Sequence, residues 1–232
     1  MAQSWSVIIF VYNEEKSIGS VIHSALQVLQ RIAPEMHELI IVDDGSTDHT
    51  ATSINSAIAG YQHIKRITHK KNEGIGKALL SGYYAALFEN ICAIPGDGQF
   101  DAGELLPFAE IPAGTIVSFY RTQKIQYTLF RRMISLMNKA MNRFFLDLKI
   151  RDINWVKVYK KSIFGTINPI LTSSLVESEI CAKALKNKYK IIEVPSVYHP
   201  REGGMSKGAS VKTIFRVVRE MFSLCFILIR RS

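Results

Sequence analysis

The 232-residue sequence has few cysteines and no apolar run long enough to cross a membrane. Its three cysteines, Cys92, Cys181 and Cys225, are widely spaced and form no CxxC pair. This spacing argues against a disulfide framework and predicts buried thiols in a reducing compartment. The best candidate for a membrane span, Met221 to Ile229, has nine uncharged residues, whereas a spanning helix needs about 20.

Other features are missing as well. The opening stretch, "MAQSWSVIIFVYNEE", lacks the basic start and the cleavage site of a secretory signal. No internal repeat or low-complexity segment is evident, and a 47% apolar content excludes general disorder. We therefore expect a cytoplasmic protein that forms one domain, with or without an appendage.

Acidic residues are scarce in the middle of the chain. Between Tyr120 and Lys161 there are eleven Lys and Arg but only two Asp, so this segment carries the whole formal net charge of +9. A concentrated basic zone implies an anionic partner, such as a membrane surface or a phosphorylated ligand. We expect no nucleic-acid partner, because no such module is recognisable and the basic residues interleave with apolar residues that face the core.

The first half of the chain alternates between apolar runs of strand length and helical patterns. Its expected elements are strands at 6–12, 38–44, 63–68 and 91–94 and helices at 16–32, from about 50 and at 74–88. This alternation predicts a parallel sheet that is covered on both faces. Such sheets bind ligands at the carboxyl ends of their strands, where polar and acidic residues stand at 12–14, 43–45 and 95–99.

The second half predicts that the α/β sheet is mixed. Its expected elements are strands at 115–121 and 189–199, a strand and then a turn within 152–164, helices at 126–146 and 173–188, a glycine-rich loop at 201–210 and a helix from 211. This last helix is amphipathic, with basic residues beside its apolar flank. It is suited to lie on an anionic membrane surface or to dock on the sheet.

Two strand-end motifs of the first half offer polar groups to a ligand. In "IVDDGSTDHT" the adjacent carboxylates of Asp43 and Asp44 can accept hydrogen bonds from a ribose or a base edge, or cap the following helix. In "NEGIGKALLSG" glycines and Lys77 stand at a helix start. That arrangement favours phosphate binding, although close helix packing selects glycine too. The residues alone leave these alternatives open.

The fourth strand breaks into "PGDGQFD", residues 95–101. In an extended segment Asp97 and Gln99 share a side, so they can present two oxygens to a hard cation such as Mg²⁺ or Mn²⁺. Asp101 is a possible third ligand, and Pro95 offers no side-chain oxygen. The alternative reading is a plain turn.

The motif "HPREGGMSKG" places Arg201, Ser206 and Lys207 around three glycines. Such a basic and flexible loop is suited to close over phosphate oxygens. The alternative is an exposed loop whose charges are solvated.

Seven blocks in this order, "FVYNEE", "VDDGSTD", "NEGIGKA", "GDGQFD", "FYR", "RDINWVKVY" and "REGGMSKG", resemble the family 2 glycosyltransferases. Within that family they are most similar to the branch of dolichyl- or polyprenyl-phosphate mannose and glucose synthases. The resemblance implies a GT-A (Rossmann-like) fold, a nucleotide-sugar donor and inversion at the anomeric carbon. It also implies a glycosyltransferase domain over residues 1–208, with a donor half at about 1–101 and an acceptor half at about 102–208. The amphipathic helix 209–232 follows.

The resemblance also implies a role for each block. The residues that would hold the nucleotide sugar are Tyr12, Glu14, Asp43, Asp44, Lys77 and Asp97. The divalent metal, Mg²⁺ or Mn²⁺, would be bound by Asp97 and Gln99. The acceptor and the phosphates would be bound by Arg121, Arg131, Arg132, Arg201, Ser206 and Lys207. Catalysis would rest on Asp97, Arg121 and Lys207. Asp152 and Lys157 match a block that family members write as aspartate followed by "FK", and Glu179 falls where the family often has an acid.

Two positions depart from the family pattern. The opening proline of "PVYNEE" is Phe10 here, and the first aspartate of the metal turn is Pro95. We expect a metal site that is competent but weakened, since the number of charged ligands helps to set metal affinity.

The implied function is transfer of a sugar to a polyprenyl phosphate at the cytoplasmic face of a membrane, by a peripheral protein. A phosphate monoester has a second pKa of about 6, so this acceptor arrives ionised and needs no general base. One alternative is transfer to a sugar hydroxyl in surface polysaccharide or glycolipid assembly, which would need a catalytic carboxylate such as Asp101, Asp152 or Glu179. Another is a protein that binds the nucleotide sugar without turnover.

Overall fold

The computed structural model describes residues 3–123, 136, 139–140, 142–144 and 146–201. Most of the helix expected at 126–146 lies outside these residues, as do Arg131, Arg132, Ser206, Lys207 and the amphipathic helix expected at 209–232. Among the described residues, no helix combines the length and apolar character that crossing a bilayer requires.

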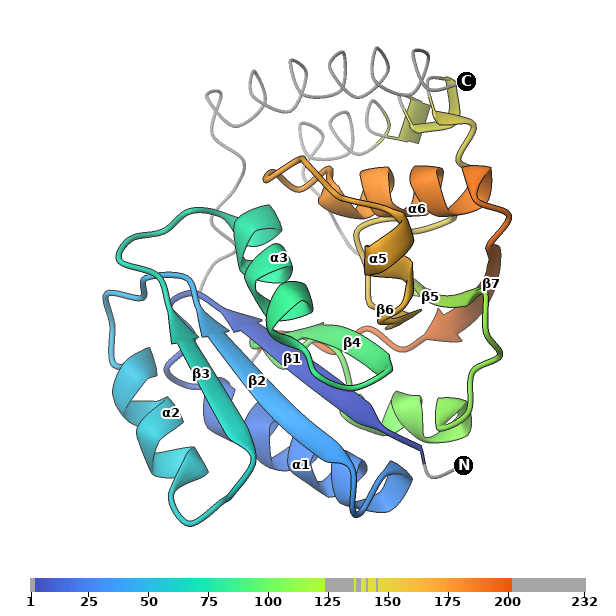
Figure 1. Cartoon of the computed structure of the whole chain (residues 1–232). Coiled ribbons are helices and arrows are strands. Elements are labelled where there is room, and N and C mark those ends of the chain that lie inside the picture. Colours follow the sequence, from blue (N-terminus) through green and yellow to red (C-terminus); the bar gives the residue numbers. More distant parts are fainter. Residues whose placement is uncertain (1–2, 124–135, 137–138, 141, 145, 202–232) are drawn as a thin grey trace.

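The described chain alternates strands and helices over its first half (Figure 1). The strands are β1 Trp5–Val11, β2 His37–Asp43, β3 Ile64–Thr68, β4 Asn90–Pro95, β5 Thr115–Arg121, β6 Lys157–Lys160 and β7 Lys190–Ser196. The helices are α1 Ile18–Ile32, α2 Thr50–Ile58, α3 Ile75–Ala85, the 3₁₀ helix η1 Ala102–Phe108, α5 Ile163–Thr166 and α6 Val176–Lys186. The strands and helices expected from the sequence are found where the structure describes the chain, and η1 is additional. Within 152–164 the strand is limited to β6, and α5 begins where a turn was expected.

The seven strands form one mixed sheet in the order β3-β2-β1-β4-β6-β5-β7. The first four strands are parallel, whereas β6 runs antiparallel to both of its neighbours, β4 and β5. The edge strand β7 is parallel to β5 and carries Pro195, a residue that edge strands tolerate. The expectation of a mostly parallel, mixed sheet is confirmed.

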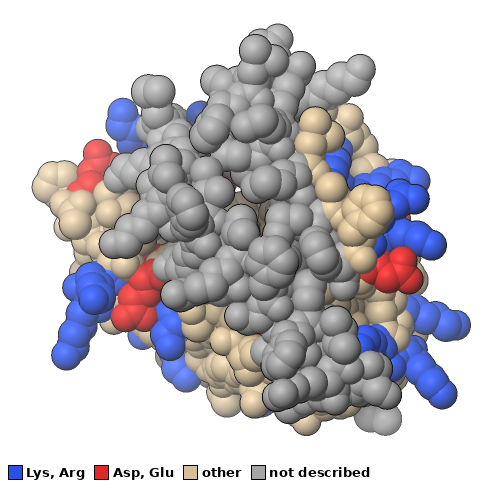
Figure 2. Space-filling model, turned by 90° about the horizontal axis from the view of Figure 1, so that it is seen from above, with Lys and Arg blue, Asp and Glu red and all other residues tan. Residues whose placement is uncertain are grey.

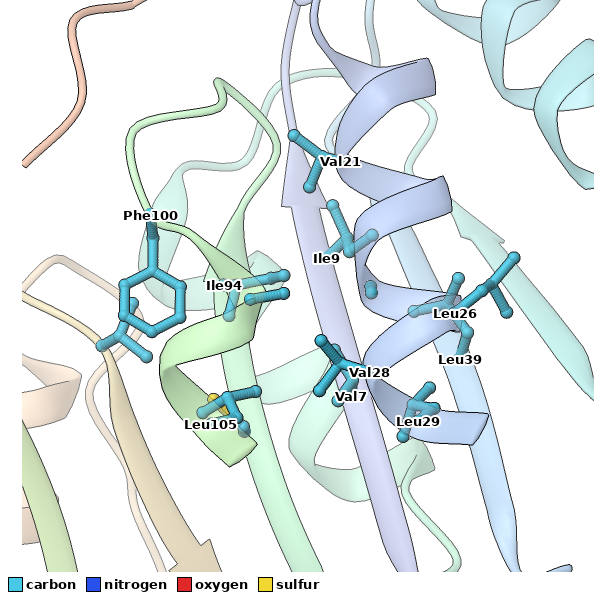
Figure 3. Close-up of a cluster of buried hydrophobic side chains, with 14 of the residues drawn as sticks. Val7, Ile9, Val21, Leu26, Val28, Leu29, Leu39, Ile94, Phe100 and Leu105 are labelled. Carbon is cyan, nitrogen blue, oxygen red and sulfur yellow. The ribbon is translucent and has the colours of Figure 1, made fainter. Parts of the chain in front are cut away.

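Helices cover both faces of the sheet because the central strands are apolar on both sides. Val7, Ile9 and Leu39 pack with α1, α2 and η1 on one face, and Figure 3 shows α1 and η1 closing over this cluster. Ile8 and Ile40, which point to the other face, pack with α3, α5 and α6. Successive residues of these strands point to opposite faces. Both faces are apolar, which is typical of a buried parallel sheet.

The start of α3 approaches the segment before α6 so closely that Gly76 leaves no room for a side chain. A Cβ atom added at Gly76 would lie 2.0 Å from the carbonyl oxygen of Ser173 and 2.5 Å from that of Thr172. Because both contacts are with backbone atoms, neither can move aside cheaply. This contact fixes how α3 meets the second half of the sheet.

We expect Gly76→Ala to lower the free energy of unfolding by about 1–3 kcal/mol, the usual cost of overpacking. Gly19→Ala is the matched control, since Gly19 is also helical and nothing lies within 4 Å of its added Cβ; we expect a change below about 1 kcal/mol. Urea unfolding of the two variants measures both values. Equal stabilities would contradict the close approach.

Candidate functional site

The polar strand ends meet at one edge of the sheet. Strand β1 lies between β2 and β4, so the strand order reverses there, and open α/β sheets bind ligands in the crevice outside such a point. The turn after β1 is tied to the turn after β2, because Asn13 N–H donates to Ser46 Oγ (2.9 Å) and Glu14 N–H to Thr50 Oγ1 (2.8 Å). The convergence expected from the sequence is confirmed.

Two cavities open at this edge. The first, of about 680 Å³, lies outside β1 and β2, and its lining includes Tyr12, Glu14 and Asp44; we call it the β1–β2 cavity. The second, of about 450 Å³, lies between α3 and α6, and its lining includes Tyr83 and Glu177; we call it the α3–α6 cavity. The residues that line both cavities are Phe10, Ile75, Pro95, Asp97 and Arg201. The two spaces therefore adjoin at the ends of β1 and β4.

Arg201 bridges two carboxylates at this junction. One of its guanidinium nitrogens lies 2.7 Å from Glu14 Oε1 and 3.1 Å from Asp97 Oδ2. Burial raises the pKa of both acids, and the Arg201 charge opposes that rise. The same cation thus offsets part of the effect of burial on each acid.

Asp97 and Gln99, which the sequence suggested as metal ligands, lie together in the turn after β4. Asp97 Oδ1 accepts a hydrogen bond from Gln99 N–H (3.1 Å), and Gln99 Nε2 donates to the Tyr198 hydroxyl. The amide is therefore oriented through its nitrogen, and its oxygen remains an acceptor. Among the described residues no group of three or more His, Cys, Asp or Glu side chains is suited to hold a metal ion alone. One carboxylate and one amide oxygen fit a Mg²⁺ or Mn²⁺ ion that substrate phosphates also coordinate.

The adjacent carboxylates after β2 act mainly on the neighbouring turns. Asp44 accepts from the N–H groups of Glu73 (2.9 Å) and Gly74 (2.8 Å), and its Oδ1 lies 2.7 Å from His69 Nδ1. Asp43 accepts from Ser46 N–H (2.9 Å). Asp44 lines the β1–β2 cavity, so it shapes the wall formed by residues 72–74. The hydrogen bonds of the two acids thus go to the turns at Ser46 and at 73–74, whereas the N–H of Thr50 at the start of α2 donates to Asp48. Capping of the following helix by the two acids is not seen, and ligand binding by them remains a prediction.

Arg121, at the end of β5, is held rigidly beside the α3–α6 cavity. Its Nε and a terminal nitrogen donate to the two oxygens of Asp152 (2.6 and 2.9 Å), which is the bidentate geometry of strong arginine–carboxylate pairs. Its guanidinium carbon also lies 4.7 Å from the centre of the Trp155 ring. The structure thus brings Arg121 and Asp152 together and fixes the position of the arginine.

The α3–α6 cavity ends on a buried polar cluster. Glu177 accepts hydrogen bonds from the hydroxyls of Tyr83 (2.6 Å) and Tyr159, and its Oε2 lies 3.3 Å from Lys157 Nζ. Burial, reinforced by the Glu177 charge, raises the pKa of both tyrosines well above the usual value. Both hydroxyls therefore stay protonated and act as donors to the carboxylate.

Five of the candidate residues lie outside both cavity linings. Two of them, Asp43 and Asp152, make the contacts described above; the other three are Lys77, Asp101 and Glu179. Lys77 is exposed on α3. Asp101 caps η1 by accepting from Gly103 N–H (2.8 Å). Glu179 is fully buried, accepts from the N–H groups of Ile170 and Leu171 and pairs with Lys183 at 2.5 Å. In this arrangement Asp101 and Glu179 have structural partners, and Lys77 does not reach the site.

Several residues of the site were not singled out from the sequence: Tyr83, Trp155, Glu177 and Tyr198. Glu177 stands two positions before Glu179 on α6, and helical spacing puts the two acids on different sides. No sequence signal says which of them faces a cavity, because nearly all residues of α6 are buried.

Figure 2 views the molecule from above, with described Lys and Arg side chains around its rim.

One family model and several individual proteins match this sequence. A family model described as glycosyl transferase family 2 matches residues 6–166. An undecaprenyl-phosphate 4-deoxy-4-formamido-L-arabinose transferase from Pectobacterium carotovorum is 27% identical over 222 residues, which cover 90% of this chain but 64% of that protein. The polyprenol monophosphomannose synthase of Mycolicibacterium smegmatis is 24% identical over 236 residues, covering 91% of this chain and 84% of that protein. The chain thus spans less than two thirds of the length of the first of these relatives.

Solved structures of similar fold include glucosyl-3-phosphoglycerate synthase from Mycobacterium tuberculosis in complex with UDP. It superposes with a TM-score of 0.71 at 17% identity, covering 96% of this chain and 80% of that chain. The same enzyme with Mn²⁺, UDP and glucosyl-3-phosphoglycerate gives a TM-score of 0.68 at 16% identity, covering 96% and 78% of the two chains. The expected GT-A fold is confirmed.

The Arg201 bridge predicts how stability depends on pH. An acid whose pKa is raised on folding stabilises the native state at low pH, and this contribution is lost as pH rises from its unfolded pKa through its folded pKa. Removing Arg201 should raise the pKa values of Glu14 and Asp97 further. We therefore expect Arg201→Ala to lose more stability than the wild type as the pH rises above about 4, near the unfolded pKa of the two acids.

Thermal unfolding of the wild type, Arg201→Ala and Arg201→Lys across that range measures the effect. Arg201→Lys is the matched control because it keeps the positive charge, so its profile should lie close to that of the wild type. Parallel profiles for all three proteins would show that the bridge does not set the charge state of the two acids.

Proposed function

Since the chain belongs to glycosyl transferase family 2, we propose that it transfers a sugar from a nucleoside-diphosphate sugar to a polyprenyl phosphate. The observation that carries the proposal is the pair of adjoining cavities, which meet at Asp97 and Arg201. One space can hold a nucleotide and the other a sugar and an acceptor. The two relatives described above are named for transfer to undecaprenyl phosphate and for synthesis of a polyprenol monophosphomannose, and these names support the acceptor class.

The donor nucleotide is assigned to the β1–β2 cavity. Tyr12, Glu14 and the turn at 72–74 line it, and the diphosphate lies toward Asp97 and Arg201 at the junction. Asp97 and Gln99 would hold a divalent metal together with the diphosphate oxygens. When bound, that metal would neutralise the charge that develops on the departing nucleoside diphosphate. Arg201 stands at the same junction and adds a positive charge fixed in position.

The acceptor phosphate is assigned to Arg121 at the opening of the α3–α6 cavity. The pairing with Asp152 holds the guanidinium in place, and its positive charge favours an anionic group. The phosphate attacks as an anion, so the protein needs to supply alignment and charge stabilisation only. Arg131, Arg132, Ser206 and Lys207 remain proposed phosphate contacts that lie outside the described residues.

A sugar hydroxyl is a poorer fit as the acceptor. It requires a carboxylate free to take a proton, yet Asp152 is paired with Arg121, Glu179 with Lys183, and Asp101 caps η1. Glu177 lines the α3–α6 cavity, but its oxygens already accept hydrogen bonds from Tyr83 and Tyr159 and lie beside Lys157. An acceptor that arrives ionised avoids this requirement.

A membrane-held lipid acceptor requires the protein to reach a membrane surface. Leu136 and Phe144 are 67% and 85% exposed, and Lys139 and Arg143 between them are exposed too. Apolar side chains next to basic ones suit the interface of an anionic leaflet. We infer a peripheral association with the cytoplasmic face of a membrane, and vesicle co-sedimentation tests it.

The central test is product formation from a panel of UDP- and GDP-sugars with a short polyprenyl phosphate. We expect a lipid-linked sugar from one donor in the presence of Mg²⁺ or Mn²⁺, and none with chelator. Asp97→Asn should lower the rate by about 100-fold or more, because the substitution removes the one carboxylate of the metal pair. Mn²⁺ binding in the presence of UDP or GDP, measured by electron paramagnetic resonance, should weaken in the same variant.

Asp101→Asn is the matched control, because Asp101 lies four residues further along the same turn and caps η1. It should keep the wild-type rate. Product in the presence of chelator, or an active Asp97→Asn variant, would overturn the metal assignment. Absence of product from every donor, with nucleotide still bound, would favour a protein that binds without turnover.

A further inference from the structure

The α3–α6 cavity has chemically different ends. Its far end is formed by Tyr83, Lys157 and Glu177, which are 3%, 2% and 7% exposed; we call these three residues the floor. The opening is shared with the β1–β2 cavity and carries Arg201, and Arg121 lines the same space. Tyr83 at the floor lies eight positions after Ile75 at the opening, which corresponds to a rise of about 12 Å along α3.

The hydrogen bonds of the floor leave acceptors for a ligand. Lys157 Nζ contacts the carbonyl oxygens of Ile153 (2.5 Å) and Trp155 (3.0 Å) and lies 3.3 Å from Glu177, so its three donors are used. The Tyr83 hydroxyl donates to Glu177. A carboxylate has about four acceptor positions, of which the two tyrosines and Lys157 take three.

The charges of the floor also favour a hydrogen-bond donor over an anionic group. Lys157 and Glu177 neutralise each other, and the donors of Lys157 and Tyr83 are already used, so the floor offers no donor to an anion. A second carboxylate placed beside Glu177 would be buried next to a like charge, which is costly. A group that donates a hydrogen bond instead meets the remaining acceptor positions of Glu177 and Tyr83.

We propose that the floor binds a hydroxyl or amino group of the transferred sugar, and that it excludes sugars that carry a carboxylate. This inference rests on the proposed function, because the sugar must extend from a diphosphate held near Asp97 into the α3–α6 cavity. Glu177 and Tyr83 then determine sugar specificity. Lys157 is a positioning residue, since it acts through Glu177.

The opening and the floor also give the substrate a direction. The anionic groups of the reaction, the diphosphate and the acceptor phosphate, stay near Arg201 and Arg121. The neutral end of the sugar points away from them along α3. An acceptor phosphate entering the floor would meet Glu177 and no free cation among the described lining residues, so the floor favours the sugar.

The test compares binding of nucleotides with binding of nucleotide sugars by the purified chain, using calorimetry. The probes are UDP, UDP-glucose and UDP-glucuronate, and GDP, GDP-mannose and GDP-mannuronate. The wild type should bind one neutral sugar nucleotide more tightly than its uronate. We expect Tyr83→Phe to weaken binding of that neutral sugar nucleotide by about tenfold and to leave binding of the plain nucleotide unchanged.

Tyr84→Phe is the matched control. It removes a hydroxyl from the next residue of α3, which is 56% exposed and contacts Asn168, and it should change neither affinity. Glu177→Gln should reduce the preference for the neutral sugar over the uronate by about tenfold, because the amide removes the like charge and adds donors. Should this variant fail to fold, Tyr83→Phe still decides the question.

Three outcomes would overturn the proposal. Equal affinities of the wild type for the uronate and for the neutral sugar nucleotide would show that the floor does not select the sugar. An equal loss for plain nucleotide and sugar nucleotide in Tyr83→Phe would assign the floor to folding. A raised KM for the polyprenyl phosphate with unchanged donor binding would assign the cavity to the lipid. Wild-type protein that binds neither UDP nor GDP would instead refute the proposed function itself.

Discussion

The architecture of the site depends on one guanidinium between two partly buried carboxylates. Glu14 follows β1, Asp97 follows β4 and Arg201 follows β7, so the bridge joins segments that are far apart in sequence. Removing one partner from such a group leaves an uncompensated charge, which costs far more than an exposed ion pair gains. The second half of the chain is therefore held against the strand ends by electrostatics as well as by apolar packing. Asp97 and Arg201 of this bridge line both cavities, and Glu14 lines the β1–β2 cavity.

The two departures from the family pattern are neighbours in space. Phe10 of β1 and Pro95 of β4 are register partners at the end of the sheet, and both line both cavities. Proline has no N–H to donate, yet the backbone stays paired because Gly96 N–H donates to the Phe10 carbonyl (3.0 Å). The loss of one carboxylate thus leaves the turn intact and makes this wall apolar. The remaining carboxylate, Asp97, keeps its backbone partner in Gln99 and its charge partner in Arg201.

Much of the fold could be predicted because the signals were local. Apolar runs of strand length that alternate with helical patterns indicated the parallel part of the sheet, and the motifs at strand ends indicated the edge that carries the site. The partners of individual side chains could not be predicted in this way. The pairing of Asp152 with Arg121 depends on how β5 meets the segment before β6. The orientation of Glu177 depends on the packing of α6, whose residues are buried on nearly every side. These contacts follow from tertiary structure and not from spacing.

Helix α3 connects the two chemical environments of the site. Its first turn borders the junction of the cavities through Ile75, and its third turn reaches the floor through Tyr83. The same helix is fixed at Gly76 by backbone contact with the segment before α6, the helix that carries Glu177. A shift of α3 would therefore move the cavity wall at the junction together with the hydroxyl that holds Glu177. The cationic groups at the opening and the hydrogen-bond acceptors of the floor lie about 12 Å apart along the helix. They can act on one substrate molecule only if α3 keeps its position, and the close backbone contact at Gly76 favours that position.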